Sequence, residues 1–362
     1  MRLRHLVWLL LSACAPKPAP PAEPAEDDTP ILPAPDAAMY AHGPSTPKDP
    51  MVALAANGLA WDESLSGAAG AIAVSGDPPT MPAVRWAAIR AGYPYPVLTA
   101  VSGTADRDVA PQGMLDNLAS LLRPGDDLGL ARARVGSSDA WVALIGRAHS
   151  RLVPFPREVS VGDAVMLAPA SDSREPFQWT LVSPHGELRS GALPADVVLD
   201  QMGEWWLEVD APGGAVVVSV PLYAGMTTPP QAVVLEGATV AGPTEATAAM
   251  LDSVNRVRQA FDLPGLSVDS TLTTLADWPL EQVVGGTWER EDGEKRLLAA
   301  GFVGGPVAQL VCSEASVPDC VDGWLRKPRD RARMLDPGFR VCGLAIQVRT
   351  DGITAVLNLA SD

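Results

Sequence analysis

The side chains best suited to chemistry are four cysteines and four histidines, and most of them lie far apart. Cys312, Cys320 and Cys342 follow one another near the C-terminal end, whereas no histidine follows His185. This spacing fits no zinc motif, so we expect no metal and no cofactor. In an oxidising compartment two of the three thiols should pair. Cys312 and Cys320 bracket a short loop around Pro318 and are the favoured pair, with Cys342 buried in a strand; the other pairings stay open.

The fourth cysteine, Cys14, follows a segment that is typical of secretion. A basic start and a short apolar run over 6–11 are too short to span a bilayer and have the flanks of a secretory signal. The string Leu11-Ser12-Ala13-Cys14 resembles the bacterial lipobox. That resemblance implies a lipoprotein with a signal peptide over 1–13 and acyl chains on Cys14 that hold it to a membrane. The alternative is an ordinary cleaved signal with an incidental cysteine.

A proline-rich stretch follows the lipidation site, over residues 14–50. Proline fixes φ and removes a hydrogen-bond donor, so we expect a disordered, extended tether rather than a packed domain. Ala15, in place of an aspartate after the cysteine, favours the outer membrane of the cell envelope. The face that the body occupies is left open.

The charge of the chain limits its partners. The chain has 27 Lys and Arg against 43 Asp and Glu, a net charge of −16. A surface this acidic argues against nucleic acid and against adsorption to anionic lipid.

Beyond the tether, composition separates the chain into segments with an α+β multidomain organisation. Residues 51–150 read as mixed α/β, residues 152–224 as a small immunoglobulin-like β-sandwich, residues 225–242 as a linker and residues 243–362 as a further domain. The expected helices are 54–65, 114–122 and one starting at Thr244; the expected strands are 128–134, 140–145, 164–168, 177–183, 205–209 and 215–222. Three tryptophans of the sandwich, Trp179, Trp205 and Trp206, are expected to pack in its core rather than to form an exposed binding face.

The last segment carries motifs of a known family. Residues 251–258 (LDSVNRVR) and 263–277 resemble the opening of a CAP (SCP-like) domain. Residues 321–325 (VDGWL) with 331–339 (RARMLDPGF) resemble its most specific motif, and 343–345 with 355–357 its closing strands. The resemblance covers about 244–360 and implies an α-β-α sandwich.

The family's cleft gathers two histidines and two acidic residues, and this chain departs from that pattern. Asp330 stands where one histidine is expected, Gln309 where a glutamate is expected, and Trp288 where the other histidine is expected. Only Asp319 is an acid in place. Acid/base work and metal binding need imidazole or paired carboxylates, so the resemblance implies a degenerate site with no catalytic residue.

The first segment repeats parts of the last. Residues 89–93 (IRAGY) resemble 298–302 (LAAGF), and Gly129-Leu130-Ala131 with Trp141-Val142 repeats Gly343-Leu344-Ala345 with Ala355-Val356 at one offset. Repeats of this kind predict a second, divergent CAP-like unit within 51–150; chance recurrence of short apolar strings is the alternative.

The sequence thus predicts an anchored envelope lipoprotein whose CAP domain is a non-catalytic binding or structural module. Its partner would be an envelope peptide, a glycan or an apolar ligand. The alternative is a CAP-type hydrolase acting on peptides or cell-wall polymers.

Overall fold

The computed structural model describes residues 39–41, 49–55, 61–76, 79–148, 150–170, 176–229, 240, 242–302, 305–350 and 352–361. The predicted lipidation site Cys14 and most of the predicted tether lie outside the described residues. None of the described helices is both long and apolar enough to cross a membrane.

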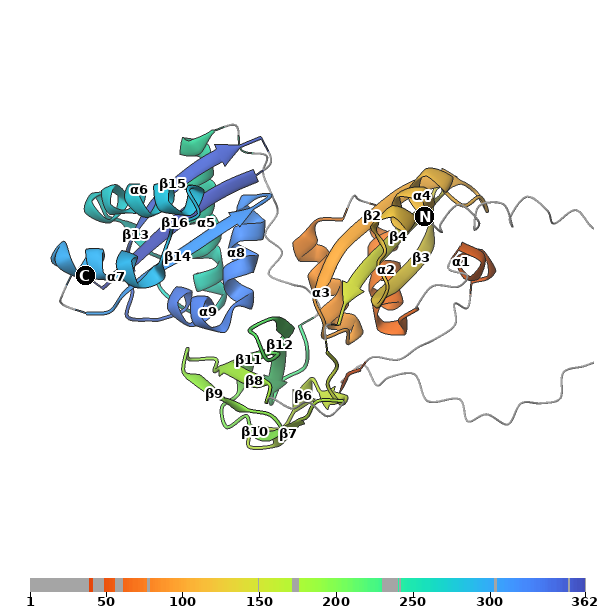
Figure 1. Ribbon diagram of the computed structural model, residues 1–362, viewed down its shortest axis with the longest axis horizontal. Helices are drawn as coiled ribbons and strands as arrows, with labels where there is room; N and C mark the ends of the chain where they lie inside the picture. Colours follow the sequence, from red (N-terminus) through yellow and green to blue (C-terminus); the bar gives the residue numbers. More distant parts are fainter. Residues whose placement is uncertain are drawn as a thin grey trace, which may run out of the picture. The chain divides into compact units, whose positions relative to one another are not determined.

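An N-terminal module, residues 61–147, packs helices against a three-stranded antiparallel sheet of order β2-β4-β3 (Figure 1). It follows the short elements β1 (Met39–Tyr40) and α1 (Pro50–Ala55). Its elements are α2 (Glu63–Ser75), α3 (Met81–Ala91), β2 (Val97–Asp106), α4 (Gln112–Leu121), β3 (Asp126–Val135) and β4 (Ser138–Arg147). The predicted helix at 114–122 and the predicted strand pair are confirmed, while α3 and β2 were not predicted.

The predicted helix over 54–65 is wrong. Trp61 forms a parallel bridge with Leu128, and the helix starts only after Asp62. The Asp62 carboxylate accepts a hydrogen bond from the Leu65 amide at 2.7 Å, which satisfies one of the free amides of a new helix start. The helix ends at Gly76, whose φ of 73° few other residues adopt.

Between residues 150 and 229 the described part of the chain forms strands and turns and no helix. A five-stranded sheet has the order β6-β12-β11-β8-β9, and a two-stranded sheet pairs β10 with β7. The strands are β5 (Phe155–Pro156), which pairs with β1, β6 (Glu158–Val159), β7 (Ala164–Leu167), β8 (Gln178–Val182), β9 (Leu188–Ala192), β10 (Ala195–Val198), β11 (Gly203–Asp210) and β12 (Val216–Ala224). All four predicted strands occur, although the two sheets are less equal than an immunoglobulin-like sandwich implies. Trp205 and Trp206 are buried and Trp179 packs against the same core, as predicted.

A C-terminal module, residues 243–360, places helices on both faces of a four-stranded sheet of order β13-β15-β16-β14 (Figure 1). On one face α5 and α8 enclose the larger core; on the other α6 packs on β15 and β16. Its elements are α5 (Pro243–Ala260), β13 (Ser267–Val268), α6 (Ser270–Val284), α7 (Arg290–Ala299), β14 (Val307–Glu314), α8 (Val317–Arg326), α9 (Pro328–Met334), β15 (Val341–Arg349) and β16 (Gly352–Ala360). The predicted α-β-α sandwich is confirmed. Helix α5 begins at Pro243, one residue before the predicted start at Thr244, and Gly242 is its N-cap; proline is well suited to the first helical position.

The two modules place equivalent residues at the start of equivalent helices. Asp62 and Asp269 each cap a helix with the side chain. The amide of Asp62 donates to the Leu128 carbonyl at 2.9 Å, and the amide of Asp269 donates to the Cys342 carbonyl at 2.8 Å. Each helix therefore begins beside a strand, β3 or β15, that pairs with the strand between it and the sheet edge formed by β2 or β14, namely β4 or β16.

The next residue in each of these strands is a glycine pressed against the helix. A Cβ on Gly129 would overlap the backbone of Leu65, and one on Gly343 would overlap the backbone of Leu272. The register continues identically, since Gly129 pairs with Leu144 of β4 and Gly343 pairs with Asn358 of β16. Only glycine permits so close a helix–strand contact.

Candidate functional site

Two of the predicted site residues meet in the C-terminal module. The indole Nε1 of Trp288 donates to Oε1 of Gln309 at 2.8 Å. Gln309 lies in β14 opposite Asn358 of β16, and its Nε2 donates to Oδ1 of Asn358 at 2.8 Å. The Asn358 amide group then donates to the Leu272 carbonyl at 3.0 Å. These contacts form one hydrogen-bonded chain from Trp288 to the first turn of α6.

This series of hydrogen bonds contains no charged group, and two of its side chains are shielded from solvent. Gln309 is 1% exposed and Asn358 is fully buried. Gly293 of α7 lies so close that a Cβ on it would overlap the Gln309 side chain. Carboxamides neither give nor take protons near neutral pH, so this group fixes α6, α7 and the sheet together but has no acid or base.

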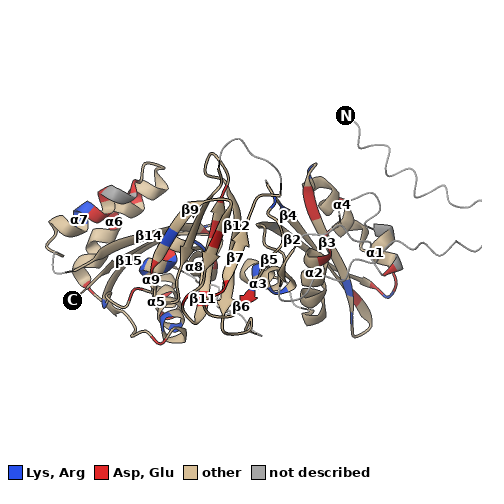
Figure 2. Ribbon diagram, turned by 90° about the horizontal axis from the view of Figure 1, so that it is seen from below, with Lys and Arg blue, Asp and Glu red and all other residues tan. Residues whose placement is uncertain are grey.

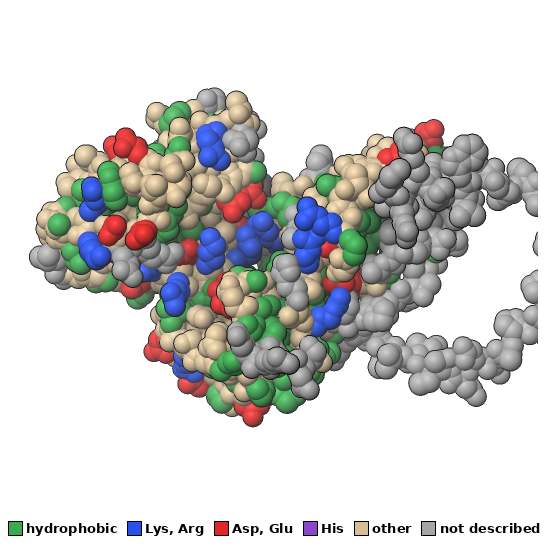
Figure 3. All heavy atoms as spheres, viewed as in Figure 1, with side chains coloured by type: hydrophobic (Ala, Val, Ile, Leu, Met, Phe, Trp, Pro, Cys, Tyr) green, Lys and Arg blue, Asp and Glu red, His purple; other side chains and the backbone are tan. Residues whose placement is uncertain are grey.

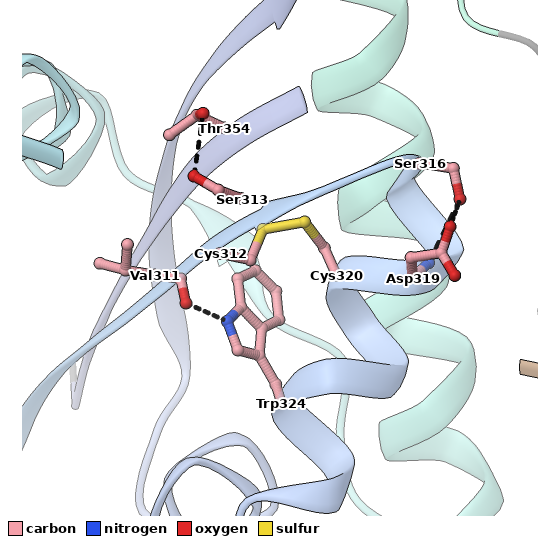
Figure 4. The surroundings of a disulfide bond; sticks show 8 residues. All are labelled: Val311, Cys312, Ser313, Ser316, Asp319, Cys320, Trp324 and Thr354. Carbon is pink, nitrogen blue, oxygen red and sulfur yellow. Dashed lines mark hydrogen bonds between the residues drawn. A yellow bond between two sulfur atoms is a disulfide. The ribbon is translucent and has the colours of Figure 1, made fainter. Parts of the chain in front are cut away.

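Asp319 forms hydrogen bonds with the N-cap residue at the start of α8. Ser316 is the N-cap of this helix; its hydroxyl donates to the Asp319 carboxylate at 2.6 Å and accepts from the Asp319 amide at 3.3 Å. This is a reciprocal capping arrangement. Figure 4 shows both residues at the end of the helix and turned away from the disulfide and Trp324. No contact joins Asp319 to Gln309.

Asp330 is buried in a helix, α9, that packs against the sandwich. It is 1% exposed in the first turn of α9, and its charge is one of those that act on Glu208 of β11. The pKa of Glu208 is raised to about 7, mainly by burial; the like charges of Asp210 and Asp330 contribute to the rise, and the charges of Lys327 and Arg329 oppose it. The position expected to hold a cleft histidine thus holds a buried carboxylate whose charge acts on Glu208.

The raised pKa of Glu208 predicts a pH dependence of stability. Between the ordinary value of 4.5 and about 7, folded Glu208 keeps a proton that the unfolded chain has released, so stability falls as pH rises through this window and is level above it. Glu208→Gln should remove roughly 1–3 kcal/mol of that fall. Urea unfolding at pH 4.5, 6 and 8 measures it, with exposed Glu187→Gln as the control. Curves for Glu208→Gln that run parallel to the wild type would contradict the raised pKa.

The cysteines follow the prediction. Cys312 of β14 and Cys320 of α8 form a disulfide with a Cα–Cα distance of 5.5 Å, and Cys342 is a buried free thiol (Figure 4). Beneath the disulfide, the Trp324 indole donates to the Val311 carbonyl at 3.1 Å. The bond and the indole together hold α8 to β14.

Two polar residues of this module were not found from the sequence. Asn358 breaks the apolar run of β16, and that interruption is the signal that could have marked it. Arg258, on the buried face of α5, donates from its guanidinium to the carbonyls of Pro264, Met334, Asp336 and Phe339. Across the part of the chain that the structure describes, no group of three or more His, Cys, Asp or Glu is placed to hold a metal.

The comparisons with known proteins concern the same module. Residues 251–359 match the model of the CAP family, described as the cysteine-rich secretory protein family. No curated protein matches the chain.

Three solved structures are similar to the chain at low identity. An outer surface protein from Borrelia burgdorferi has 16% identity and a TM-score of 0.30 over 35% of this chain and 98% of its own. A cysteine-rich secretory protein from Staphylococcus aureus has 12% identity and a TM-score of 0.29 over 58% and 86%. An extracellular protein containing an SCP domain from Bacillus anthracis has 13% identity and a TM-score of 0.29 over 72% and 78%. With TM-scores this low, the family-model match carries the assignment, and it identifies residues 251–359 as a CAP domain.

Proposed function

We propose that this chain is an envelope lipoprotein whose CAP domain has lost the family's site and works as a non-catalytic binding or structural module. The carrying observation is the closed chain Trp288–Gln309–Asn358, which puts neutral groups where proton transfer or a metal would need imidazole and carboxylate. Asp319 supports the proposal because its carboxylate is hydrogen-bonded to Ser316 at the start of α8. Asp330 supports it because a carboxylate stands there in place of the expected imidazole.

Zinc binding separates this function from the alternative, a CAP-type hydrolase. Calorimetry with zinc chloride should show no stoichiometric binding to the wild type. Trp288→His combined with Gln309→Glu places an imidazole next to a carboxylate and should raise zinc affinity by about tenfold. Trp278→His, on α6 and stacked on Arg296, is the matched control and should leave affinity unchanged. Stoichiometric zinc binding by the wild type would favour the hydrolase.

The charge distribution supports a protein or glycan partner rather than nucleic acid. Both acidic and basic residues occur along the ribbon in Figure 2, and Figure 3 shows Lys and Arg side chains gathered near the middle of the drawn face with Asp and Glu side chains beside them. Several basic side chains form ion pairs; Arg326 contacts Asp322 at 2.9 Å and Arg85 contacts the same carboxylate at 2.6 Å. Paired cations contribute little to the release of counterions on which phosphate-backbone binding depends.

The anchor is proposed from the lipobox-like string that ends in Cys14. Cys14→Ser removes the acylated thiol, so the protein should move from the membrane pellet to the soluble fraction. Fractionation with detection of the C-terminal module measures this. Ser12→Thr, a small change beside the same cleavage point, is the control that should stay with the membrane. Incorporation of a labelled fatty acid into Cys14→Ser would refute lipidation at this residue.

We also infer that residues 61–147 are a second CAP-like unit. The support is the shared path of the chain: a capped helix at Asp62 or Asp269, a strand glycine at 129 or 343, and an antiparallel three-strand order that ends at β2 or β14. The helix that precedes each of these edge strands also ends alike, since Gly92 and Gly301 both adopt a positive φ, of 86° and 99°.

A further inference from the structure

The free edge of the N-terminal sheet distinguishes the two modules. Strand β2 pairs with β4 along one side over residues 97–106. On its other side no hydrogen bond from any described residue reaches the backbone between 99 and 105. Among the described residues β2 is therefore an edge strand (Figure 1), and none of them pairs with its outward amides and carbonyls.

The equivalent edge in the C-terminal module is closed. Ser102 pairs with Val142 as Val311 pairs with Val356, so Ser102 and Val311 occupy the same place. The Val311 carbonyl points outward and accepts from Trp324, and the next residue, Cys312, is bonded to Cys320 (Figure 4). In the N-terminal module Gly103 follows Ser102, and α4 offers neither a disulfide nor an indole.

The open positions follow from the alternation of an antiparallel strand, in which every second residue directs its N–H and C=O away from the partner. Because Val311 points outward, its equivalent Ser102 does so too, and so do Ala100 and Thr104. Ser102 and Thr104 are also exposed. Residues 99–105 (TAVSGTA), which we call the strip, are seven uncharged residues without proline. Natural edges that stay single are protected by charge, proline or bulges. Residues 99–105 have neither charge nor proline, and the irregularity in the pairing of β2 lies at their start, between Val97 and Thr99.

A groove lies between β2 and α2, and it is open because several of the residues that line it are small. Its volume is about 180 Å³, and Ile72, Ala73, Ser102 and Thr104 are among its lining residues. In the C-terminal module the equivalent space is filled by Leu280, Val283 and Val311, which pack on Ala276 and Val356. Smaller residues at the equivalent N-terminal positions leave room for side chains from another strand.

We propose that a second copy of this chain pairs with β2, antiparallel, about a two-fold axis at Ser102. Ser102 then faces Ser102 of the second copy, and Ala100 faces Thr104 of the second copy. The three outward residues of each copy exchange backbone hydrogen bonds, and no charged side chain meets another. An uncharged strip with outward groups at equal intervals is complementary to itself, which makes a second copy the fitting occupant. This proposal does not depend on the function of the CAP domain.

The two-fold axis gives a charge-swap test, because residue 102 meets itself. The chain from Ala15 onward should show a monomer–dimer equilibrium by sedimentation over about 1 to 100 µM. Ser102→Lys puts two ammonium groups opposite each other and should weaken association by about tenfold, and Ser102→Asp should do the same. An equimolar mixture of the two variants should associate again. Ser120→Lys, an exposed change on α4, is the control that should dimerise like the wild type.

A second variant tests the backbone directly. Ser102→Pro removes the outward N–H, which an edge strand tolerates without unfolding, and should also abolish the dimer; circular dichroism confirms the fold. A wild type that stays monomeric over the whole concentration range overturns the proposal, even if it binds other extended peptides. So does undiminished self-association of Ser102→Lys, or failure of the mixed variants to associate.

Discussion

Replacing Arg258 by methionine should lower the free energy of unfolding of the C-terminal module by about 3–5 kcal/mol. The side chain is fully buried and donates to carbonyls on both sides of the module: Pro264 after α5, and Met334, Asp336 and Phe339 before β15. Methionine fills much of the volume but donates nothing. Four carbonyl groups would therefore lose their partner together, and the bonds to Met334 and Phe339 are buried.

Urea unfolding followed by tryptophan fluorescence measures the loss. Arg256→Met is the matched control, since Arg256 lies on the exposed side of the same helix and contacts Asp252 at 3.0 Å in an i,i+4 pair. A pair of this kind contributes about 0.3–0.5 kcal/mol. Equal effects of the two substitutions would show that Arg258 does not hold the 334–339 segment.

Gly343→Ala should destabilise the C-terminal module by about 3 kcal/mol or more, and Gly129→Ala should do the same to the N-terminal module. In each, the added methyl group would overlap helix backbone, at Leu272 or at Leu65, and backbone cannot turn aside as a side chain can. The helix would have to move off its sheet. Equal outcomes at the two glycines would also support the second CAP-like unit.

Thermal unfolding by circular dichroism separates these substitutions from an ordinary glycine change. The control is Gly113→Ala, on α4, where nothing lies within 4 Å of the added group. Alanine in the helix should raise stability there by about 0.5–1 kcal/mol. Variants at 129 or 343 that melt with the wild type would rule out the close helix–strand contact.

The sequence predicted the parts of this fold that have strong local signals. Alternating apolar residues gave the strands of the sandwich, and the motif around Trp324 gave the CAP domain. Strand β2 escaped because its side chains are small and half polar, and its place in the sheet comes from pairing with β4. The start of α2 escaped because the decisive bond joins Asp62 to Leu128, distant in sequence.

The candidate site was predictable only in part. Motif spacing brought Trp288 and Gln309 into one group, and they are hydrogen-bonded. The same spacing added Asp319, whose carboxylate is hydrogen-bonded to Ser316 at the start of α8, and Asp330, which is buried in the first turn of α9. Asn358 carries no motif, and only the register of β14 with β16 places it beside Gln309.

The reactivity of Cys342 can report how often the C-terminal module opens. The thiol is fully buried, and burial raises its pKa to about 11, so it offers almost no thiolate to an alkylating reagent while the module is folded. Because Cys312 and Cys320 are joined in a disulfide, Cys342 is the thiol of this module that a maleimide can modify. The rate of that modification therefore measures how often this module unfolds enough to expose Cys342. In an oxidising surrounding the same burial keeps a single unpaired sulfur from exchanging with its disulfide neighbours.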